Sequence, residues 1–165
     1  MATLNLNLKQ DDPFYRYKMP AVMLKHEGKN TRIRTVFVNI TDIAKSLYRS
    51  PKYVLKFLST TLGVQMLIDC DSRYILKGHH KKEDIQDLIS KFLNKYVLCT
   101  GCSNPETYLR LASKKVRLVC IACGHSSILD DEHKFTKYLM SHPPSAEDFK
   151  QLLKKQKQRQ AKRQE

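Results

Sequence analysis

Four cysteines in two close pairs are the residues whose spacing most clearly predicts chemistry. Cys99 and Cys102 form one C-x2-C pair and Cys120 and Cys123 form the other, with seventeen residues between the pairs. Thiolates suit zinc, and each short pair can direct two sulfurs at one tetrahedral ion. Two disulfides or a redox pair are the alternatives, but a reducing compartment disfavours disulfides and a redox pair needs only one C-x2-C. The spacing therefore predicts a structural Zn²⁺, because four thiolate ligands leave no position open for a reacting water.

Three other possible ligands stand near these pairs or near a predicted strand. Cys70 follows a run of apolar residues, so we expect a small buried side chain rather than a ligand. His125 and His133 come after the last cysteine, when the predicted tetrahedron is already complete. We expect both histidines at the surface or beside the site.

An aromatic and basic segment precedes the first predicted folded element. It reads Asp12-Pro-Phe-Tyr-Arg-Tyr-Lys-Met-Pro20, with Arg16 between two tyrosines. A guanidinium carried on such an arm could enter a partner's nucleotide site and stabilise charge on phosphoryl oxygens, with the aromatic residues as anchors. Alternatively, the segment covers its own domain with Phe14 and Tyr17. Composition alone favours this second interpretation.

The charge balance points to a polyanionic partner. The 165 residues include 30 Lys and Arg against 16 Asp and Glu, a formal net charge of +14. RNA or a ribonucleoprotein fits this excess better than a membrane, since no amphipathic anchor accompanies it; a merely solubilising surface is the alternative. No apolar stretch approaches the ~18 residues of a membrane span, and the amino terminus does not resemble a signal peptide. We therefore expect a monomeric cytoplasmic protein without membrane contact.

Hydrophobic patterning predicts the elements that hold these residues. A β-branched and aromatic run predicts a strand over Thr35–Ile40, and Thr41 is the expected N-cap of a helix over Asp42–Arg49. The other expected elements are a helix from Pro51 to Gly63, a hairpin of Val64–Cys70 and Arg73–Gly78, a helix over Lys82–Tyr96, ribbon strands at Tyr108–Leu111 and Val116–Val119, and a last helix from Ser145.

These elements predict an α+β fold: a small α/β domain, a mixed sheet with helices, followed by a four-cysteine zinc ribbon. The expected division is an extended aromatic-basic arm and loop over residues 1–31, the α/β domain over 32–97, the zinc ribbon over 98–144, and a basic helical or disordered tail over 145–165.

An ordered set of short motifs resembles a known family. The motifs are Asp12 to Pro20, Val38-Asn-Ile-Thr-Asp42, Cys99-x-x-Cys-x-Asn-Pro-Glu-Thr107, Cys120-x-Ala-Cys-Gly124, Leu129-Asp130, His133-Lys134 and Pro143-Pro144. Together they resemble the amino-terminal domain of eukaryotic translation initiation factor 5, whose fold is shared with the beta subunit of initiation factor 2. The resemblance covers about residues 11–145, and the aromatic arm favours initiation factor 5 over the beta subunit.

The resemblance implies a GTPase-activating protein that acts on the gamma subunit of initiation factor 2. The implied setting is the preinitiation complex, with the small ribosomal subunit, ribosomal RNA and initiator tRNA as partners. Arg16 matches the arginine finger proposed for the family, and Arg34 and Lys56 match supporting basic residues. No GxxxxGK[ST] phosphate loop is present, so GTP would be contacted only at the partner's site, and we expect no active site of the chain's own.

Two other functions remain open at this point. The chain could be a non-activating binding module similar to the beta subunit of initiation factor 2, or a competitor of the resident factor. In the family a long linker and a helical-repeat domain follow this region, whereas a tail rich in Lys, Arg and Gln runs to Glu165 here.

Overall fold

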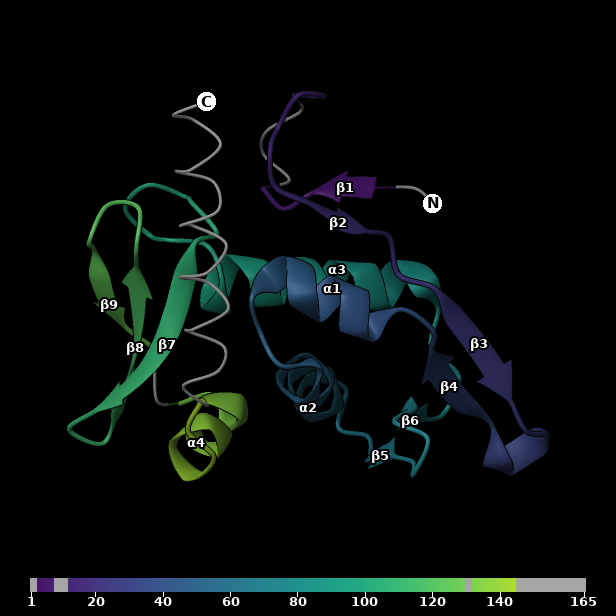
Figure 1. Ribbon diagram of the computed structural model, residues 1–165. Coiled ribbons are helices and arrows are strands. Elements are labelled where there is room, and N and C mark those ends of the chain that lie inside the picture. The colour runs from purple at the N-terminus through teal and green to yellow at the C-terminus, as the bar shows by residue number, and fades with distance from the viewer. Residues whose placement is uncertain (1–2, 8–11, 130–131, 145–165) are drawn as a thin grey trace. The chain divides into compact units, whose positions relative to one another are not determined.

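The computed structural model describes residues 3–7, 12–129 and 132–144 (Figure 1). The chain divides into two compact units, Met1–Lys95 and Tyr96–Glu165, which are described separately. The elements, in chain order, are β1 (Thr3–Asn5), β2 (Lys18–Pro20), β3 (Leu24–Glu27), the 3₁₀ turn η1 (Asn30–Arg32), β4 (Arg34–Phe37), α1 (Ile40–Leu47), α2 (Pro51–Leu62), β5 (Met66–Ile68), β6 (Tyr74–Lys77), α3 (Lys82–Tyr96), β7 (Thr107–Ala112), β8 (Lys115–Cys120), β9 (Ser126–Ile128) and α4 (Lys134–Ser141).

The first unit is built on a four-stranded antiparallel sheet. Its strand order is β3-β4-β6-β5, and β5 pairs with β6 as the predicted hairpin requires. The turn between β3 and β4 depends on Gly28, whose φ is +96° and where a Cβ would clash with the carbonyl oxygen of Arg32. With the helices, this sheet confirms the predicted α+β fold, but its described pairings are all antiparallel, whereas a mixed sheet was expected.

The helices of the first unit follow the predicted apolar spacing closely. α2 begins with Pro51 in its first turn and ends at Gly63, whose φ of 68° is the left-handed conformation that favours glycine. α3 spans the predicted range without change. Phe57 of α2 and Phe92 of α3 are both buried, with ring centroids 5.2 Å apart. Aromatic packing between α2 and α3 therefore forms part of the core.

The start of α1 differs from the prediction because of Asn39. α1 begins at Ile40, so Thr41 lies inside the helix, and Asn39 occupies the N-cap position without a side-chain cap bond. The carboxamide of Asn39 instead accepts from the Met23 amide at 2.9 Å and donates to the Ala21 carbonyl at 2.8 Å. Asn39 is 4% exposed. Its side chain thus fastens the segment before β3 to the start of α1.

The segment before β3 contributes to the core of the first unit. β1 pairs antiparallel with β2, and β2 contacts α1. Leu6, Met19 and Val22 are fully buried. The Leu6 amide also donates to the Tyr17 carbonyl at 2.9 Å, which extends the pairing beyond the strands.

In its described residues, the second unit is a three-stranded antiparallel sheet with the helix α4. The sheet order is β7-β8-β9, and the two predicted ribbon strands lie within β7 and β8. Their two-residue turn places Ser113 and Lys114 at positive φ, the geometry of a type I′ hairpin. β9 and α4 extend the predicted ribbon. The expected helix from Ser145 lies outside the described residues.

The helix α4 closes the core of the second unit. His133 is its N-cap and accepts from the Phe135 amide through Nδ1 at 3.1 Å. The buried Phe135 ring lies edge-on to Tyr96, with centroids 4.9 Å apart, and the Tyr96 hydroxyl is 3.1 Å from Thr136 Oγ1. Across the described parts of both units, no helix is long and apolar enough to cross a bilayer.

The Asn39 contacts lead to a stability prediction. We expect Asn39→Ala to lower the free energy of unfolding by about 1–3 kcal/mol, because a buried amide and a carbonyl each lose their partner. Urea unfolding followed by circular dichroism measures this loss. Thr41→Ala is the control and should change stability by less than about 0.5 kcal/mol. Equal losses in the two variants would contradict the assignment of Asn39.

Candidate metal centre and arginine turn

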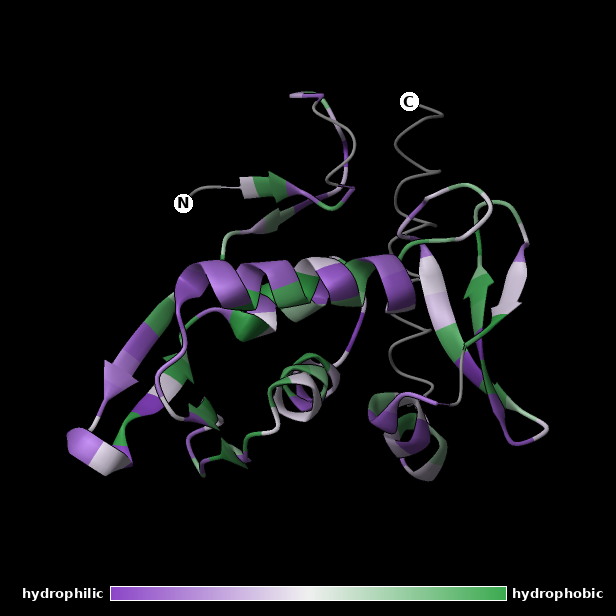
Figure 2. Ribbon diagram, turned by 180° about the vertical axis from the view of Figure 1, so that it is seen from behind, coloured by the Kyte–Doolittle hydropathy of each residue, from purple (hydrophilic) through white to green (hydrophobic). Residues whose placement is uncertain are grey.

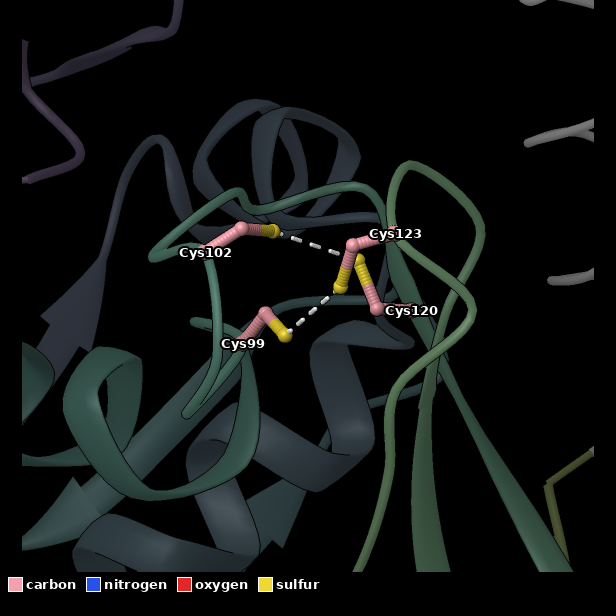
Figure 3. Close-up of side chains that lie close together, drawn as sticks. All are labelled: Cys99, Cys102, Cys120 and Cys123. Carbon is pink, nitrogen blue, oxygen red and sulfur yellow. Dashed lines mark hydrogen bonds between the residues drawn. The ribbon is translucent and has the colours of Figure 1, made fainter.

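The four predicted zinc ligands lie together at one end of the three-stranded sheet. Their sulfurs are all within 4.8 Å of one another. Cys99 Sγ is 3.6 Å from Cys123 Sγ, and Cys102 Sγ is 3.6 Å from Cys120 Sγ (Figure 3). Each close contact therefore joins one cysteine of the first pair to one of the second, and the four side chains converge on a common point.

Two tight turns bring the sulfurs together. The Ser103 amide donates to the Cys99 carbonyl at 2.9 Å, and the Gly124 amide donates to the Cys120 carbonyl at 3.1 Å. Ser103 and Gly124 both have positive φ. The Gly101 amide also donates to Cys99 Sγ at 3.3 Å, a contact that favours a thiolate at that position. The two turns therefore have the same construction around the two pairs.

The sulfur geometry fits a tetrahedral metal ion. In a tetrahedron with metal–sulfur bonds of about 2.3 Å, neighbouring sulfurs lie about 3.8 Å apart. The two separations of 3.6 Å are close to this value and far from a disulfide bond, which measures about 2.0 Å. All four cysteines are free thiols in the structure. The donor set and its geometry therefore suit a soft divalent cation such as Zn²⁺.

The four thiols have different surroundings. Burial is the main cause that raises the pKa of Cys120, to about 12. A hydrogen bond from the backbone of His125 is the main cause that lowers the pKa of Cys123 to about 7. Burial also raises the pKa of Cys102. The site thus combines a buried side with a side open to solvent.

The remaining candidate ligands stay outside this cluster. His125 is exposed, and its ring lies close to the position that a Cβ on Gly101 would take. His133 caps α4, as described above. Cys70 is exposed rather than buried, which corrects the sequence prediction. Cys70 lies in the β5–β6 turn, where its thiol donates to Asp69 at 3.3 Å. Because this turn lies at the surface, the Cys70 side chain is exposed to solvent.

The predicted arginine lies in an ordered turn before β2. The Asp12 side chain accepts from the Phe14 amide at 2.8 Å, and the Asp12 carbonyl accepts from the Tyr15 amide at 3.0 Å. Lys18 Nζ donates to the Pro13 carbonyl at 2.6 Å. We call residues 12–17 the arginine turn. These bonds fix the backbone before Arg16, and the bond from the Leu6 amide to the Tyr17 carbonyl fixes it after Arg16.

The aromatic residues of the arginine turn do not all cover the domain. Tyr15 and Tyr17 are half-buried and lie edge-to-face, with centroids 5.8 Å apart. The Arg16 guanidinium is exposed, 5.9 Å from the centroid of the Tyr17 ring. Phe14, in contrast, is 91% exposed. The interpretation in which Phe14 covers the core is therefore wrong for this residue, because the Asp12 turn directs it to solvent.

The two predicted supporting residues lie on other elements of the first unit. Arg34 is exposed at the start of β4, beside η1, and Lys56 is half-buried in the middle of α2. Figure 1 shows the arginine turn and the η1 end of β4 at opposite sides of this unit. The structure thus places Arg16, Arg34 and Lys56 on three separate segments of the first unit.

Comparison with known proteins supports a single family. The family model that matches residues 7–126 describes a domain found in initiation factors 2B and 5. Eukaryotic translation initiation factor 5 of Mus musculus is 41% identical over 150 residues, 89% of this chain and 35% of the mouse protein. The protein of the same name from Caenorhabditis elegans is 42% identical over 154 residues, 92% of this chain and 35% of its own length.

A fungal relative gives the same picture. The probable eukaryotic translation initiation factor 5 of Schizosaccharomyces pombe is 43% identical over 148 residues, 88% of this chain and 38% of the relative. The chain therefore spans little more than a third of the length of the curated relatives it matches. The match to the family model covers both the arginine turn and all four cysteines, and on this ground the chain belongs to the family of domains found in initiation factors 2B and 5.

Proposed function

We propose that the protein acts in cytoplasmic translation initiation as a GTPase-activating protein for initiation factor 2. The relatives named eukaryotic translation initiation factor 5 support the setting, and the exposed Arg16 on an ordered turn is the observation that supports the activity. GTP would be bound by the partner GTPase, and this chain would supply a side chain to it.

The proposed mechanism is electrostatic. Hydrolysis spreads negative charge over the oxygens of the transferred phosphoryl group, and an arginine supplied in trans stabilises that charge. A guanidinium suits this task because it stays charged and donates several hydrogen bonds from one plane. Within the described residues, no carboxylate pairs with Arg16, whose guanidinium lies over the Tyr17 ring. Its charge therefore remains available to a partner.

The order of the arginine turn supports the same proposal. A side chain that enters a partner's site loses less conformational freedom if its backbone is already fixed. The Asp12 bonds provide that fixation, and the buried Leu6 and Met19 hold the strands on either side. Phe14 would add an apolar contact, since burying such a side chain contributes roughly 1.5–3 kcal/mol. The turn thus offers an anchor two residues from the catalytic arginine.

Arg34 and Lys56 would support activation from separate places. They lie on β4 and α2, away from the arginine turn, so contact with the transferred phosphate is assigned to Arg16 alone. We propose that they contact other parts of the complex and help dock the first unit. The gamma subunit of initiation factor 2, the small ribosomal subunit, ribosomal RNA and initiator tRNA are the proposed partners. The net charge of +14 suits the RNA among them.

The proposed metal is one structural Zn²⁺ held by Cys99, Cys102, Cys120 and Cys123. When bound, it would supply no reaction chemistry, because four sulfur ligands fill its coordination sphere. Its contribution would be to hold β7, β8 and the two cysteine turns in place. The described residues of this unit form a short three-stranded sheet with one eight-residue helix, and domains of such small size are commonly stabilised by a bound metal.

The activation proposal predicts the effect of removing the guanidinium. Arg16→Ala should abolish the acceleration of single-turnover GTP hydrolysis by initiation factor 2 in reconstituted preinitiation complexes. Arginine fingers supplied in trans contribute about 10³–10⁵ in rate. Arg16→Lys should recover only a small part of this, since an ammonium lacks the planar donor geometry. The measurement is the rate of phosphate release after rapid mixing.

A control variant distinguishes the specific effect of Arg16 from the general effect of removing one positive charge. Lys91→Ala removes one exposed positive charge from α3 and should leave the rate unchanged. If Arg16→Ala accelerates hydrolysis as well as the wild type does, Arg16 is not the finger. If the wild type gives no acceleration, the activation proposal fails, and binding without activation or competition with the resident factor becomes the better account.

The zinc proposal predicts both stoichiometry and a selective structural loss. Purified protein should contain one zinc per chain by plasma mass spectrometry, and Cys102→Ser should lower this content strongly. Chelation should unfold the second unit and leave the helices of the first, because only the second unit's core depends on the sulfurs. Amide exchange measured by mass spectrometry distinguishes the two units.

Cys70→Ser is the matched control for this prediction. Cys70 is exposed and contacts Asp69 rather than the cysteine cluster, so this variant should retain one zinc. An equal loss of zinc in both serine variants would contradict the four-sulfur assignment.

A further inference from the structure

Two arginines face each other across the central strand pair of the second unit. Arg110 of β7 is directly opposite Arg117 of β8, and both are exposed. Residues opposite each other on antiparallel strands have Cβ atoms about 4.5–5.5 Å apart, and like charges at that distance destabilise the sheet. Neither arginine has a carboxylate partner among the residues described. The Arg110–Arg117 pair therefore lowers the stability of the sheet, and no contact among the sheet's described residues accounts for two arginines at these positions.

The surrounding charges add to this repulsion. Lys115 lies on the same face of β8 as Arg117, and Lys114 lies next to Lys115 in the turn between β7 and β8. Strands β7, β8 and β9 contain no Asp or Glu. The strands and the turn between β7 and β8 thus place four cations close together, with no acidic residue between them among the residues that the structure describes. Such an arrangement suits a polyanion that neutralises all four.

The same face carries apolar and aromatic side chains. The register places Tyr108 opposite Val119, and Ile128 opposite Arg117. Tyr108 and Val119 are half-buried, whereas Ile128 is 53% exposed. The alternate residues of β7 and β8, such as Leu109, Val116 and Leu118, are buried on the opposite face. Figure 2 shows these strands alternating between polar and apolar residues.

We propose that this outer face of the ribbon sheet binds an RNA strand. We call it the ribbon face and define it by Tyr108, Arg110, Lys115, Arg117, Val119 and Ile128. Arg110 and Arg117 contact neighbouring phosphates, and the apolar side chains beside them contact bases or riboses. A sheet that combines cations with an aromatic platform is typical of single-strand binding. An acidic protein segment would use the charges but not the platform.

This proposal does not depend on the arginine turn. It concerns a different unit of the chain and involves no GTP or GTPase. Failure of GTPase activation would leave RNA binding by the ribbon face intact, and loss of RNA binding would leave the Arg16 proposal standing. The two proposals are therefore tested separately.

The test is a salt titration with the full chain. A fluorescein-labelled single-stranded RNA of about twelve nucleotides, within the span of common single-strand sites, is titrated with wild type and with the double variant Arg110→Ala/Arg117→Ala. Fluorescence anisotropy measures binding over a range of KCl concentrations. Loss of two phosphate contacts should reduce the slope of log affinity against log salt by about 1.4 and lower affinity about tenfold or more. The double variant should melt no lower than the wild type, because it removes a repulsive pair.

A variant of equal charge serves as the control. Lys91→Ala/Lys137→Ala removes two exposed cations from α3 and α4 and should retain the wild-type slope within about 0.3. Arg117→Gln is a milder change and should reduce the slope of log affinity against log salt by about half as much as the double variant does. This single variant replaces the double variant in the test if the double variant unfolds. Equal slopes for the ribbon-face and control variants would overturn the proposal. Displacement of the RNA by polyglutamate at equal charge concentration would also overturn it, in favour of an acidic protein.

Discussion

The convergence of four cysteine sulfurs is the constraint on which the second unit depends. Their separation within 4.8 Å joins the loop after α3 to the end of β8, two segments that are distant in the sequence. The apolar core of this unit is small in extent, and its buried residues are Tyr96, Val97, Leu98, Leu109, Val116, Leu118, Leu129, Phe135 and Leu139. A bound cation would therefore add stabilisation that so small a core does not supply. The repulsion between Arg110 and Arg117 makes that contribution more necessary.

In the first unit, hydrogen bonds and buried apolar side chains hold the arginine turn in place. Among the described residues, the arginine turn is connected to a sheet of two strands, and hydrogen bonds fix the backbone of the turn. Buried Leu6 and Met19 hold the flanking strands, and the Asp12 side chain closes the turn. The two proposed roles therefore fall in different units: the cysteines of the second unit would hold a structural metal, and the reaction chemistry would belong to Arg16 of the first unit. A metal-binding motif in a sequence thus need not mark the place where the chemistry occurs.

Local signals predicted much of this structure. α2 and α3 follow from Pro51, Gly63 and a repeated apolar face, and the cysteine cluster follows from the spacing of its two pairs. Asn39 could not be predicted in the same way. An asparagine before a helix favours a capping bond, but here its amide binds the backbone at Ala21 and Met23, a contact that only tertiary structure creates. α1 therefore starts two residues earlier than the sequence indicated.

Exposure was the other property that the sequence predicted poorly. Cys70 was expected to be buried, and composition alone favoured a buried Phe14, yet each lies in a turn that directs it to solvent. Turns are determined by hydrogen bonds such as those of Asp12 and Asp69, and hydrophobicity does not report them. The Arg110–Arg117 pair needed the strand register, which a sequence without its partner strand does not provide.

The structural character of the metal centre can be measured directly by X-ray absorption at the zinc edge. We expect a coordination shell of four sulfurs at about 2.3 Å, with no oxygen or nitrogen ligand. Such a shell would leave no position for a reacting water and would confine the metal to a scaffolding role. A shell with three or fewer sulfurs and a lighter atom at about 2.0 Å would contradict this account, because the four cysteines would then not fill the coordination sphere and a water could occupy the remaining position.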